Sequence, residues 1–159
     1  MCAEKEFASV FARVEKKFIL TDEQARAVIE ALGQQGFQEN IFGSPLIQSI
    51  YFDTPDCTLA RRSVERPDYK EKLRLRAYGE PRESDTAYIE IKKKAAGVVY
   101  KRRTGLALPE ALEAVRRGKL PEACGQIGRE IEWFVHTYPG LRPTAVTACE
   151  RRAFEQPEQ

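Results

Sequence analysis

Tyr69-Lys-Glu-Lys-Leu-Arg-Leu-Arg-Ala-Tyr78 alternates charged and apolar side chains along most of its length. Successive residues of a β-strand point to opposite faces, so this stretch predicts a strand with one cationic face and one apolar face. The cationic face would carry Lys70, Lys72, Arg74 and Arg76. The apolar face would pack into a core, and Glu71 is the one charged residue on it.

Two later stretches repeat the alternation. Tyr88, Glu90, Lys92 and Lys94 would share one face of the first, and Val99, Lys101 and Arg103 one face of the second. Gly97 lies between the two stretches and predicts a hairpin turn, which would set their cationic faces on the same side of one antiparallel sheet.

The charge of the chain is concentrated in this region. Between Arg61 and Arg103 there are fourteen Lys and Arg but seven Asp and Glu, an excess of +7 in a chain whose net charge is +2. A single cationic strand face is usually solvated surface. Three in succession favour a site for phosphate, because Arg and Lys together suit a chain of tetrahedral anions.

Composition bounds the class of protein. The 159 residues, 42% of them hydrophobic, are enough for one core, and we expect one domain, 1–159. No apolar stretch reaches membrane-spanning length and the first residues do not form a signal peptide, so we expect a cytoplasmic protein without membrane insertion. The four cysteines and one histidine show no metal-binding or disulfide spacing.

Nucleic acid is a weaker candidate partner than a phosphate compound. A pI near 8.3 is too mild to indicate a nucleic-acid surface by itself. Single-stranded RNA is bound by stacking bases on several exposed aromatic side chains, and only Tyr78 and Tyr88 would lie suitably on the cationic strands. We therefore expect no nucleic-acid partner.

The rest of the chain predicts further strands and helices. Val10–Leu20 and Leu46–Asp53 read as strands, as does the stretch from about Thr144 to Phe154. Thr21-Asp-Glu-Gln24 matches a capping box and predicts a helix that stops near Gly36. Helical spacing returns after Pro109, in two segments. This order predicts an α+β protein.

Six short strings, taken in order, resemble the VTC-type polyphosphate polymerase domain, a branch of the triphosphate tunnel metalloenzyme fold that also includes the CYTH phosphatases. The strings are Arg13-x-Glu15-x-Lys17-Phe18, Ser49-Ile-Tyr-Phe-Asp-Thr54, Lys72-Leu-Arg-Leu-Arg-x-Tyr-Gly79, Ile89-Glu-Ile-Lys92, Lys101-Arg-Arg103 and Glu150-Arg-Arg-Ala-Phe154. Arg13 stands where the phosphatases would have a first glutamate, which favours the VTC branch.

The resemblance implies a fold and a set of site residues. The fold would be an antiparallel β-barrel or partly open tunnel with helices packed outside. The residues that would bind ATP or polyphosphate are Lys17, Lys72, Arg74, Arg76, Lys92, Lys101 and Arg151. Arg74, Arg76 and Lys92 would act on the transferred phosphoryl group, while Glu15 and Glu90 would bind Mn²⁺ or Mg²⁺.

Several alternatives stay open. Glu15 and Glu90 could equally be ion-pair partners of the cations around them. A non-catalytic module that binds polyphosphate or inositol phosphate would use the same basic strands. The family continues beyond Phe154 with further strands, so we expect a domain that is incomplete at its C-terminus, with an edge strand through which a homo-oligomer could form.

Overall fold

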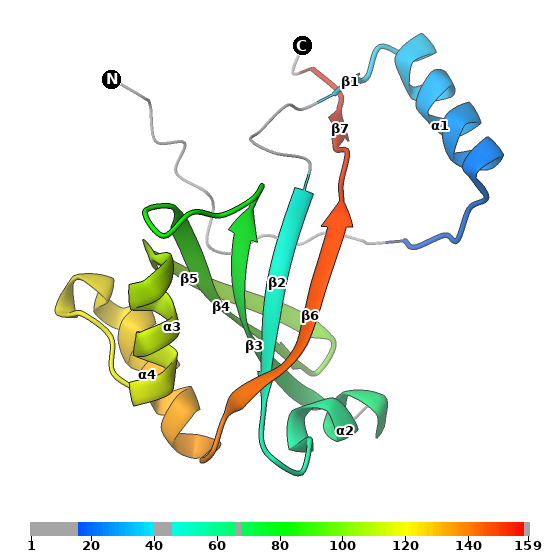
Figure 1. Ribbon diagram of the computed structural model, residues 1–159. Coiled ribbons are helices and arrows are strands. Elements are labelled where there is room, and N and C mark those ends of the chain that lie inside the picture. The colour runs from blue at the N-terminus through cyan, green and yellow to red at the C-terminus, as the bar shows by residue number, and fades with distance from the viewer. Residues whose placement is uncertain (1–15, 40–45, 66–67, 158–159) are drawn as a thin grey trace.

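The computed structural model describes residues 16–39, 46–65 and 68–157, and its centre is one antiparallel sheet of five strands. The strands are β2 (Leu46–Asp53), β3 (Tyr69–Tyr78), β4 (Thr86–Ala95), β5 (Val98–Ala107) and β6 (Arg142–Glu150). They lie in the order β5-β4-β3-β2-β6, which leaves β5 and β6 as edges (Figure 1). The predicted α+β class is confirmed in its partly open form, since the described strands do not close into a barrel.

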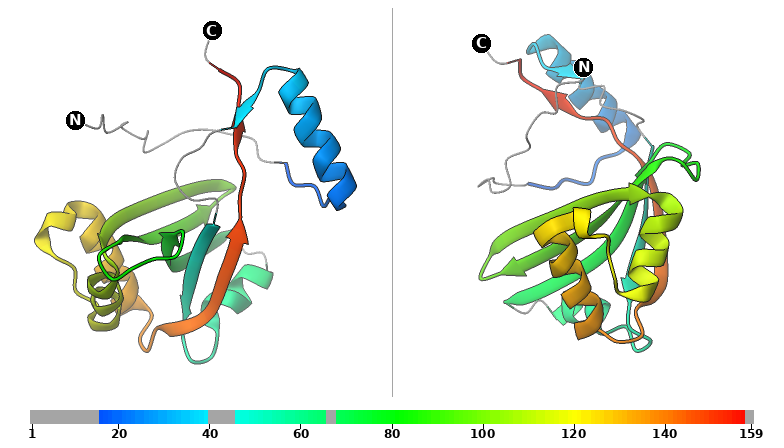
Figure 2. Two further views of the ribbon diagram at one scale, coloured as in Figure 1. Left: turned by 45° about the horizontal axis from the view of Figure 1, so that its top comes forward. Right: turned by 90° about the vertical axis from the view of Figure 1, so that its left-hand side faces the viewer.

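Helices cover one face of this sheet and leave the other to the cations. α3 (Leu108–Arg117), the short helix η1 (Glu122–Cys124) and α4 (Gly125–Thr137) lie across the covered face (Figure 2). α2 (Thr58–Glu65) adds Leu59 to the same core. The apolar side chains of β3 and β4 that fill this core are Leu73, Leu75, Ala87, Ile89 and Ile91. None of the helices in the described part is long and apolar enough to cross a membrane.

The hairpin between β4 and β5 forms where the sequence predicts it. Ala95 pairs with Val98, so Ala96 and Gly97 are the two turn residues. Their φ angles are 46° and 84°, the left-handed conformation that a two-residue hairpin turn requires at both positions. Glycine adopts it without steric cost, which explains Gly97 in the turn.

The helix α1 (Asp22–Gln34) begins with the predicted capping box. The Gln24 backbone N–H donates to Thr21 Oγ1 at 3.3 Å, and the Thr21 backbone N–H donates to Gln24 Oε1 at 2.9 Å. No residue of α1 is buried, and the helix projects away from the sheet (Figure 1). The start of the helix therefore follows from its local sequence.

Two predicted strands need correction. Val10–Leu20 extends beyond the described residues, and its described part, 16–20, is exposed and not a strand, because no described strand pairs with it. The final strand ends at Glu150, since its partner β2 begins at Leu46 and the ladder stops there. Further on, β7 (Phe154–Glu155) pairs with β1 (Gln38–Glu39), a contact that we did not predict.

Candidate anion-binding face

The register of β3, β4 and β5 arranges the cations in rows across the sheet. Lys72 lies opposite Lys92, which lies opposite Lys101, so three lysines stand side by side on strands about 4.8 Å apart. The next row holds Arg74, Glu90 and Arg103. We call the cationic face the side of the sheet that carries Lys70, Lys72, Arg74, Arg76, Lys92, Lys94, Lys101 and Arg103.

Glu90 lies in the middle of the cationic face and is only 1% exposed. Arg74 places Nε and Nη2 each 2.6 Å from its Oε2, and Lys101 Nζ lies 3.0 Å from Oε1. Lys101 and Glu90 form an ion pair through this contact. The angle at Oε1 does not suit a hydrogen bond, so Oε1 accepts none. Burial acts to raise the pKa of Glu90, but the charges of Arg74 and Lys101 outweigh it and lower the pKa below its ordinary value.

Side chains of β2 and β4 orient the arginines. Arg74 Nη1 donates to the hydroxyl of Tyr51 at 3.1 Å, and Arg76 Nε donates to Ser49 Oγ at 3.3 Å. The guanidinium carbon of Arg103 lies 4.8 Å from the ring centre of Tyr88. All three guanidinium groups are therefore partly buried and held by neighbours.

The lysines of the face differ from the arginines in exposure. Lys72, Lys92, Lys94 and Lys101 are exposed, and they lie toward the β4–β5 turn. Long, exposed ammonium groups can follow a bound anion, whereas a fixed guanidinium selects one geometry. The cationic face thus has an ordered arginine end and an exposed lysine end.

The structure brings together most of the predicted site residues. Lys72, Arg74, Arg76, Lys92 and Lys101 all lie on the cationic face. Lys17 lies in the segment before α1, and Arg151 is exposed just beyond β6, so neither is on the sheet. Glu15 falls outside the described residues.

The orienting residues Ser49 and Tyr51 were missed. Both alternate with Ile50 and Phe52, which pack in the core, and therefore face the same way as the cations. The period-two pattern of Leu46–Asp53 contained that signal, but the pairing of β2 with β3 was needed to interpret it.

The described carboxylates do not fit a site for Mn²⁺ or Mg²⁺. These residues contain no group of three or more His, Cys, Asp and Glu side chains that could hold an ion. Both oxygens of Glu90 already face cations. Asp53 accepts from the backbone N–H groups of Leu59 and Ala60, both at 2.9 Å, and so caps α2. The sequence left two roles open for Glu90, as a metal ligand or as an ion-pair partner. Its contacts with Arg74 and Lys101 are those of an ion-pair partner.

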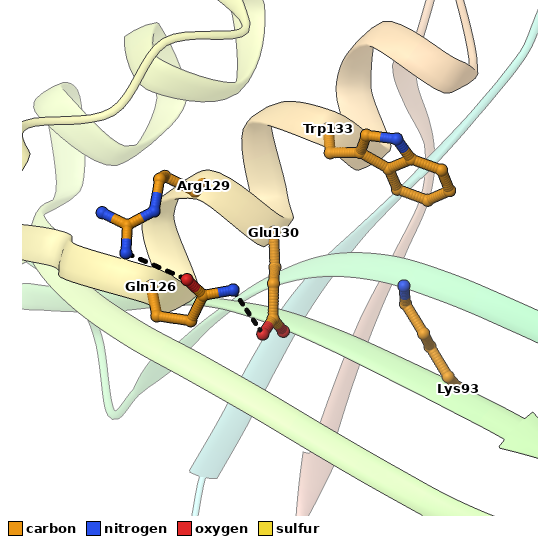
Figure 3. A pocket seen from close by; sticks show the side chains of 5 residues that line it. All are labelled: Lys93, Gln126, Arg129, Glu130 and Trp133. Atoms are coloured by element: carbon orange, nitrogen blue, oxygen red, sulfur yellow. Dashed lines mark hydrogen bonds between the residues drawn. The ribbon is translucent and has the colours of Figure 1, made fainter.

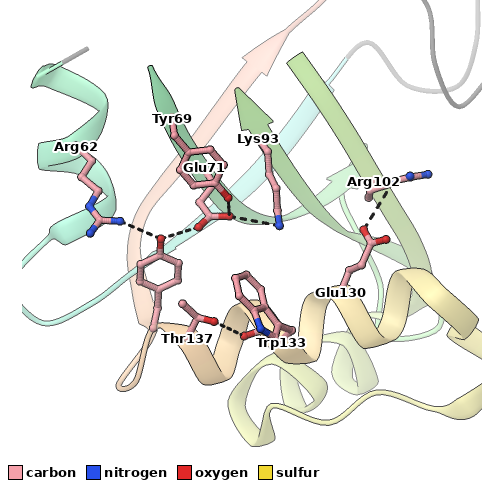
Figure 4. A network of polar contacts seen from close by, with 9 residues as sticks. Arg62, Tyr69, Glu71, Lys93, Arg102, Glu130, Trp133 and Thr137 are labelled. Carbon is pink, nitrogen blue, oxygen red and sulfur yellow. Dashed lines mark hydrogen bonds and ion pairs between the residues drawn. The ribbon is translucent and has the colours of Figure 1, made fainter. Parts of the chain in front are cut away.

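Glu71 lies on the apolar face of β3, where polar side chains on the helix-covered side of the sheet contact its carboxylate. The hydroxyls of Tyr69 and Tyr138 donate to its two oxygens at 2.9 and 2.6 Å, and Lys93 Nζ lies 3.6 Å away (Figure 4). Burial, together with the Glu71 carboxylate, raises the pKa of both tyrosines to about 12. This network ties the end of α4 to β3 and lies on the opposite side of the sheet from the cationic face.

Comparison of the sequence with known proteins finds a matching family and a related protein. The sequence profile of one family, described as VTC domain, matches residues 12–159. "Vacuolar transporter chaperone complex subunit 4" of Trypanosoma brucei brucei is 31% identical over an alignment that covers 71% of this chain. The aligned part is 18% of the length of that protein.

A solved structure shares the fold. The crystal structure of a proposed adenylate cyclase from Bacillus halodurans superimposes with a TM-score of 0.53, at 18% sequence identity. The match covers 83% of this chain and 60% of the other. The sheet with its outer helices is therefore an arrangement that this chain has in common with a distant protein.

Proposed function

This chain belongs to the VTC domain family, and we propose that its cationic face binds the phosphate chain of a nucleoside triphosphate or of polyphosphate. One observation carries the proposal. Eight cations from three adjacent strands share one face, and its central carboxylate, Glu90, is already neutralised by Arg74 and Lys101. Anion binding is what such a field favours.

The row arrangement favours an extended polyanion over a single phosphate. The row of Lys72, Lys92 and Lys101 and the arginine rows lie at successive positions along the strands. A linear chain of phosphates can contact several rows at once, whereas one phosphate can contact only its neighbours. Fixed guanidinium forks would hold one part of the chain, and the exposed lysines would neutralise the rest.

Phosphoryl transfer to polyphosphate is the second candidate function. Such a reaction depends on positioning and charge neutralisation, which Arg74, Arg76 and Lys92 could supply without a covalent nucleophile. Its support is the resemblance of the sequence to the VTC-type polyphosphate polymerase domain, together with the family match over residues 12–159. The chain aligns with 18% of its Trypanosoma relative. Because the described carboxylates do not fit a Mn²⁺ or Mg²⁺ site, we assign no step to a metal ion. Binding alone, as in a module for polyphosphate or inositol phosphate, needs only the face described.

We also propose that residues 1–159 form one domain. The core cluster draws side chains from β2, β3, β4 and all the helices from α2 to α4. One continuous core of this kind is the mark of one folding unit.

Calorimetric titration of the chain with phosphate, triphosphate and polyphosphate at one ionic strength tests the proposal. We expect affinity to rise with chain length and to fall in the Lys72→Ala/Lys92→Ala variant. The matched control is Lys119→Ala, which removes an exposed lysine between α3 and η1. Equal losses in variant and control would indicate a diffuse surface field, and equal affinity for phosphate and triphosphate would contradict the extended site.

A further inference from the structure

Two tyrosines continue the cationic face beyond its arginine end. Tyr78 follows Arg76 by two residues on β3, and Tyr88 lies opposite Arg76 on β4, so both are on the same side of the sheet as the cations. Arg76 is the last cation of the face in this direction, and Ile47 of β2 lies opposite Tyr78. The rows of the face therefore change along the strands from lysine, through arginine, to tyrosine.

Neighbouring residues of β3 and β5 fix the position of the Tyr88 ring. The guanidinium carbon of Arg103 lies 4.8 Å from its ring centre, and the Tyr78 ring meets it edge to face, with centres 6.0 Å apart and planes at 77°. The residue opposite Tyr88 on β5 is Gly105, where an added Cβ would lie 3.3 Å from Tyr88 Cε1 and 2.9 Å from Thr86 Cγ2. Glycine at this position leaves the space that the Tyr88 ring occupies.

Tyr78 is the more accessible member of the pair. Its side chain is exposed, whereas Tyr88 is half-buried between its neighbours. Every nucleobase has a π face that can stack on an aromatic side chain. An exposed tyrosine in contact with a second, fixed aromatic ring can therefore serve as a stacking platform.

An uncharged aromatic end distinguishes among the ligands that the cationic face could bind. Polyphosphate is anionic along its whole length, and inositol phosphate carries its anions around one ring, so neither has a part that suits Tyr78 and Tyr88. A nucleoside triphosphate has an anionic end and an aromatic end, joined by a ribose. Its chemistry follows the same order as the rows of the face.

The spacing along β3 also suits a nucleoside triphosphate. Tyr78 lies two residues beyond Arg76, roughly 7 Å along the strand, and Arg74 lies two residues before Arg76. A ribose would lie between a base stacked on Tyr78 and a phosphate bound by Arg76. The following phosphates would then contact Arg74 and the row of lysines.

Trp133 offers another exposed ring, but on the opposite side of the sheet. It lines a pocket of about 300 Å³ where α4 crosses β4, together with Lys93, Gln126, Arg129 and Glu130 (Figure 3). Lys93 alternates with the cations of β4 and therefore lies on the helix-covered side, where its ammonium group is paired with Glu71. A base stacked on Trp133 could not have its phosphates on the cationic face.

We propose that Tyr78, in contact with Tyr88, forms a base-stacking subsite, and that the cationic face binds a nucleoside triphosphate with its base at the tyrosine end and its phosphates directed toward the lysines. One platform suits a single nucleotide, whereas a strand of nucleic acid needs several. This inference rests on the proposed binding of phosphate by the cationic face. Inorganic triphosphate lacks the base, so it separates the two proposals.

Calorimetric titration with ATP and with inorganic triphosphate, without divalent ions and at one ionic strength, tests the subsite. Tyr78→Ala should weaken ATP binding roughly five- to a hundredfold, the range for the loss of one stacked base, and leave triphosphate binding unchanged. Tyr78→Phe keeps the ring and should bind ATP as the unsubstituted chain does. Tyr100→Ala is the matched control, because Tyr100 is an exposed tyrosine opposite Lys93 on the helix-covered side, and it should change neither affinity.

Fluorescence gives a second, independent readout. Trp133 is the one tryptophan of the sequence and lies on the helix-covered side, so ATP should leave its emission unchanged. In a Trp133→Phe background, Tyr78→Trp places the reporter in the subsite. ATP should quench this emission more strongly than triphosphate does.

The possible results distinguish failure of the subsite from failure of the phosphate site. If Tyr78→Ala weakens the binding of both ligands equally, or of neither, the subsite is overturned and the phosphate site stands. A change in Trp133 emission on adding ATP would place the base on the helix-covered side and would also overturn the subsite. If neither ligand binds, the proposed function is contradicted and the subsite with it.

Discussion

Substitution of Arg76 is the most direct single-residue test of anion binding at the cationic face. It is partly buried and oriented by Ser49, and it does not pair with Glu90. Arg76→Ala should weaken triphosphate binding by about 1.5–3 kcal/mol, the range for a hydrogen bond to a charged group. Arg82→Ala, in the exposed turn between β3 and β4, should change little. Calorimetric titration measures both, and equal losses would contradict a formed site.

Arg74 would give a less direct answer, because its removal also leaves Glu90 buried without its main partner. Breaking one side of such a pair strongly destabilises a protein. Arg74→Ala should therefore lower the free energy of unfolding as well as the affinity.

The lowered pKa of Glu90 should make the free energy of unfolding decrease at acid pH. Its pKa is below the ordinary 4.5 in the folded chain, so its ion pairs stabilise the fold above pH 4.5 and this contribution is lost as the pH falls through the lowered value. Urea unfolding between neutral and acid pH should show a smaller loss of stability on acidification for Glu90→Gln than for the unsubstituted chain.

Glu113 is the control for this pH dependence. Hydrogen bonds from Arg116 and Arg117 outweigh desolvation and lower the pKa of Glu113 to about 2. The group lies at the surface of α3, where solvent screens its ion pairs. Glu113→Gln should change the acid dependence much less. If the two variants behave alike, Glu90 does not hold the buried charge assigned to it.

For single residues, the sequence predicted which face of a strand a side chain lies on better than it predicted which side chain it contacts. Strict alternation was enough to place Lys72, Arg74, Arg76, Lys92 and Lys101 on one side of a sheet. The pairing of Arg74 with Glu90 depends on the register between β3 and β4, which alternation does not fix. The role of Glu71 depended on Tyr138, which lies 67 residues away in the sequence.

The helices differ in how much the rest of the molecule depends on them. Thr21→Ala removes the cap of α1 and should cost that helix about 1 kcal/mol. Because α1 buries no residue, the global free energy of unfolding should stay unchanged. Hydrogen exchange should become faster in α1 and stay constant in β3, and an equal change in both would show that α1 is part of the core.

Gly118 is the contrasting position, at the end of α3. Its φ is 67°, and an added Cβ would lie 3.1 Å from Val135 Cγ1 and 3.3 Å from His136 Cε1. Gly118→Ala should therefore lower global stability by about 1 kcal/mol or more, since α3 buries Ala111, Ala114 and Val115. Thermal unfolding measures this, and an unchanged midpoint would contradict the packing of α3 on α4.

At the element scale, local signals were reliable and long-range ones were not. The capping box, the Gly97 hairpin and the three cationic strands were all predicted from neighbouring residues. Residues 16–20 are the described end of the predicted strand Val10–Leu20, but they lack a described partner, and a single strand is not stable alone. The pairing of β1 with β7 joins residues more than a hundred positions apart, which no local pattern indicates.

β6 is an exposed edge strand of the five-stranded sheet. All nine of its residues are exposed, and among the described strands only β2 pairs with it. An uncovered edge of this kind can pair with another chain, so we expect the protein to aggregate through it at high concentration. Val146→Lys, at a valine that is 70% exposed, should reduce light scattering at high concentration. Unchanged scattering would show that this edge is not the site of aggregation.

The molecule has two chemically distinct sides. The helices α3 and α4 and the apolar core lie on one, and the cations lie on the other, where Lys70 donates to the Ser63 carbonyl of α2 (Figure 2). A cationic sheet face repels itself in the absence of anions, so a bound polyanion should stabilise the whole fold.

Thermal unfolding with and without inorganic triphosphate, against sodium chloride at equal ionic strength, tests this account most directly. Ligand at a hundredfold its Kd stabilises the folded state by about 2.7 kcal/mol, which is roughly 5–10 °C in Tm for a domain of this size. We predict that increase with triphosphate, little change with chloride, and a reduced increase in the Lys72→Ala/Lys92→Ala variant. If triphosphate raises Tm no more than chloride does, the cationic face is ordinary surface and not a phosphate site.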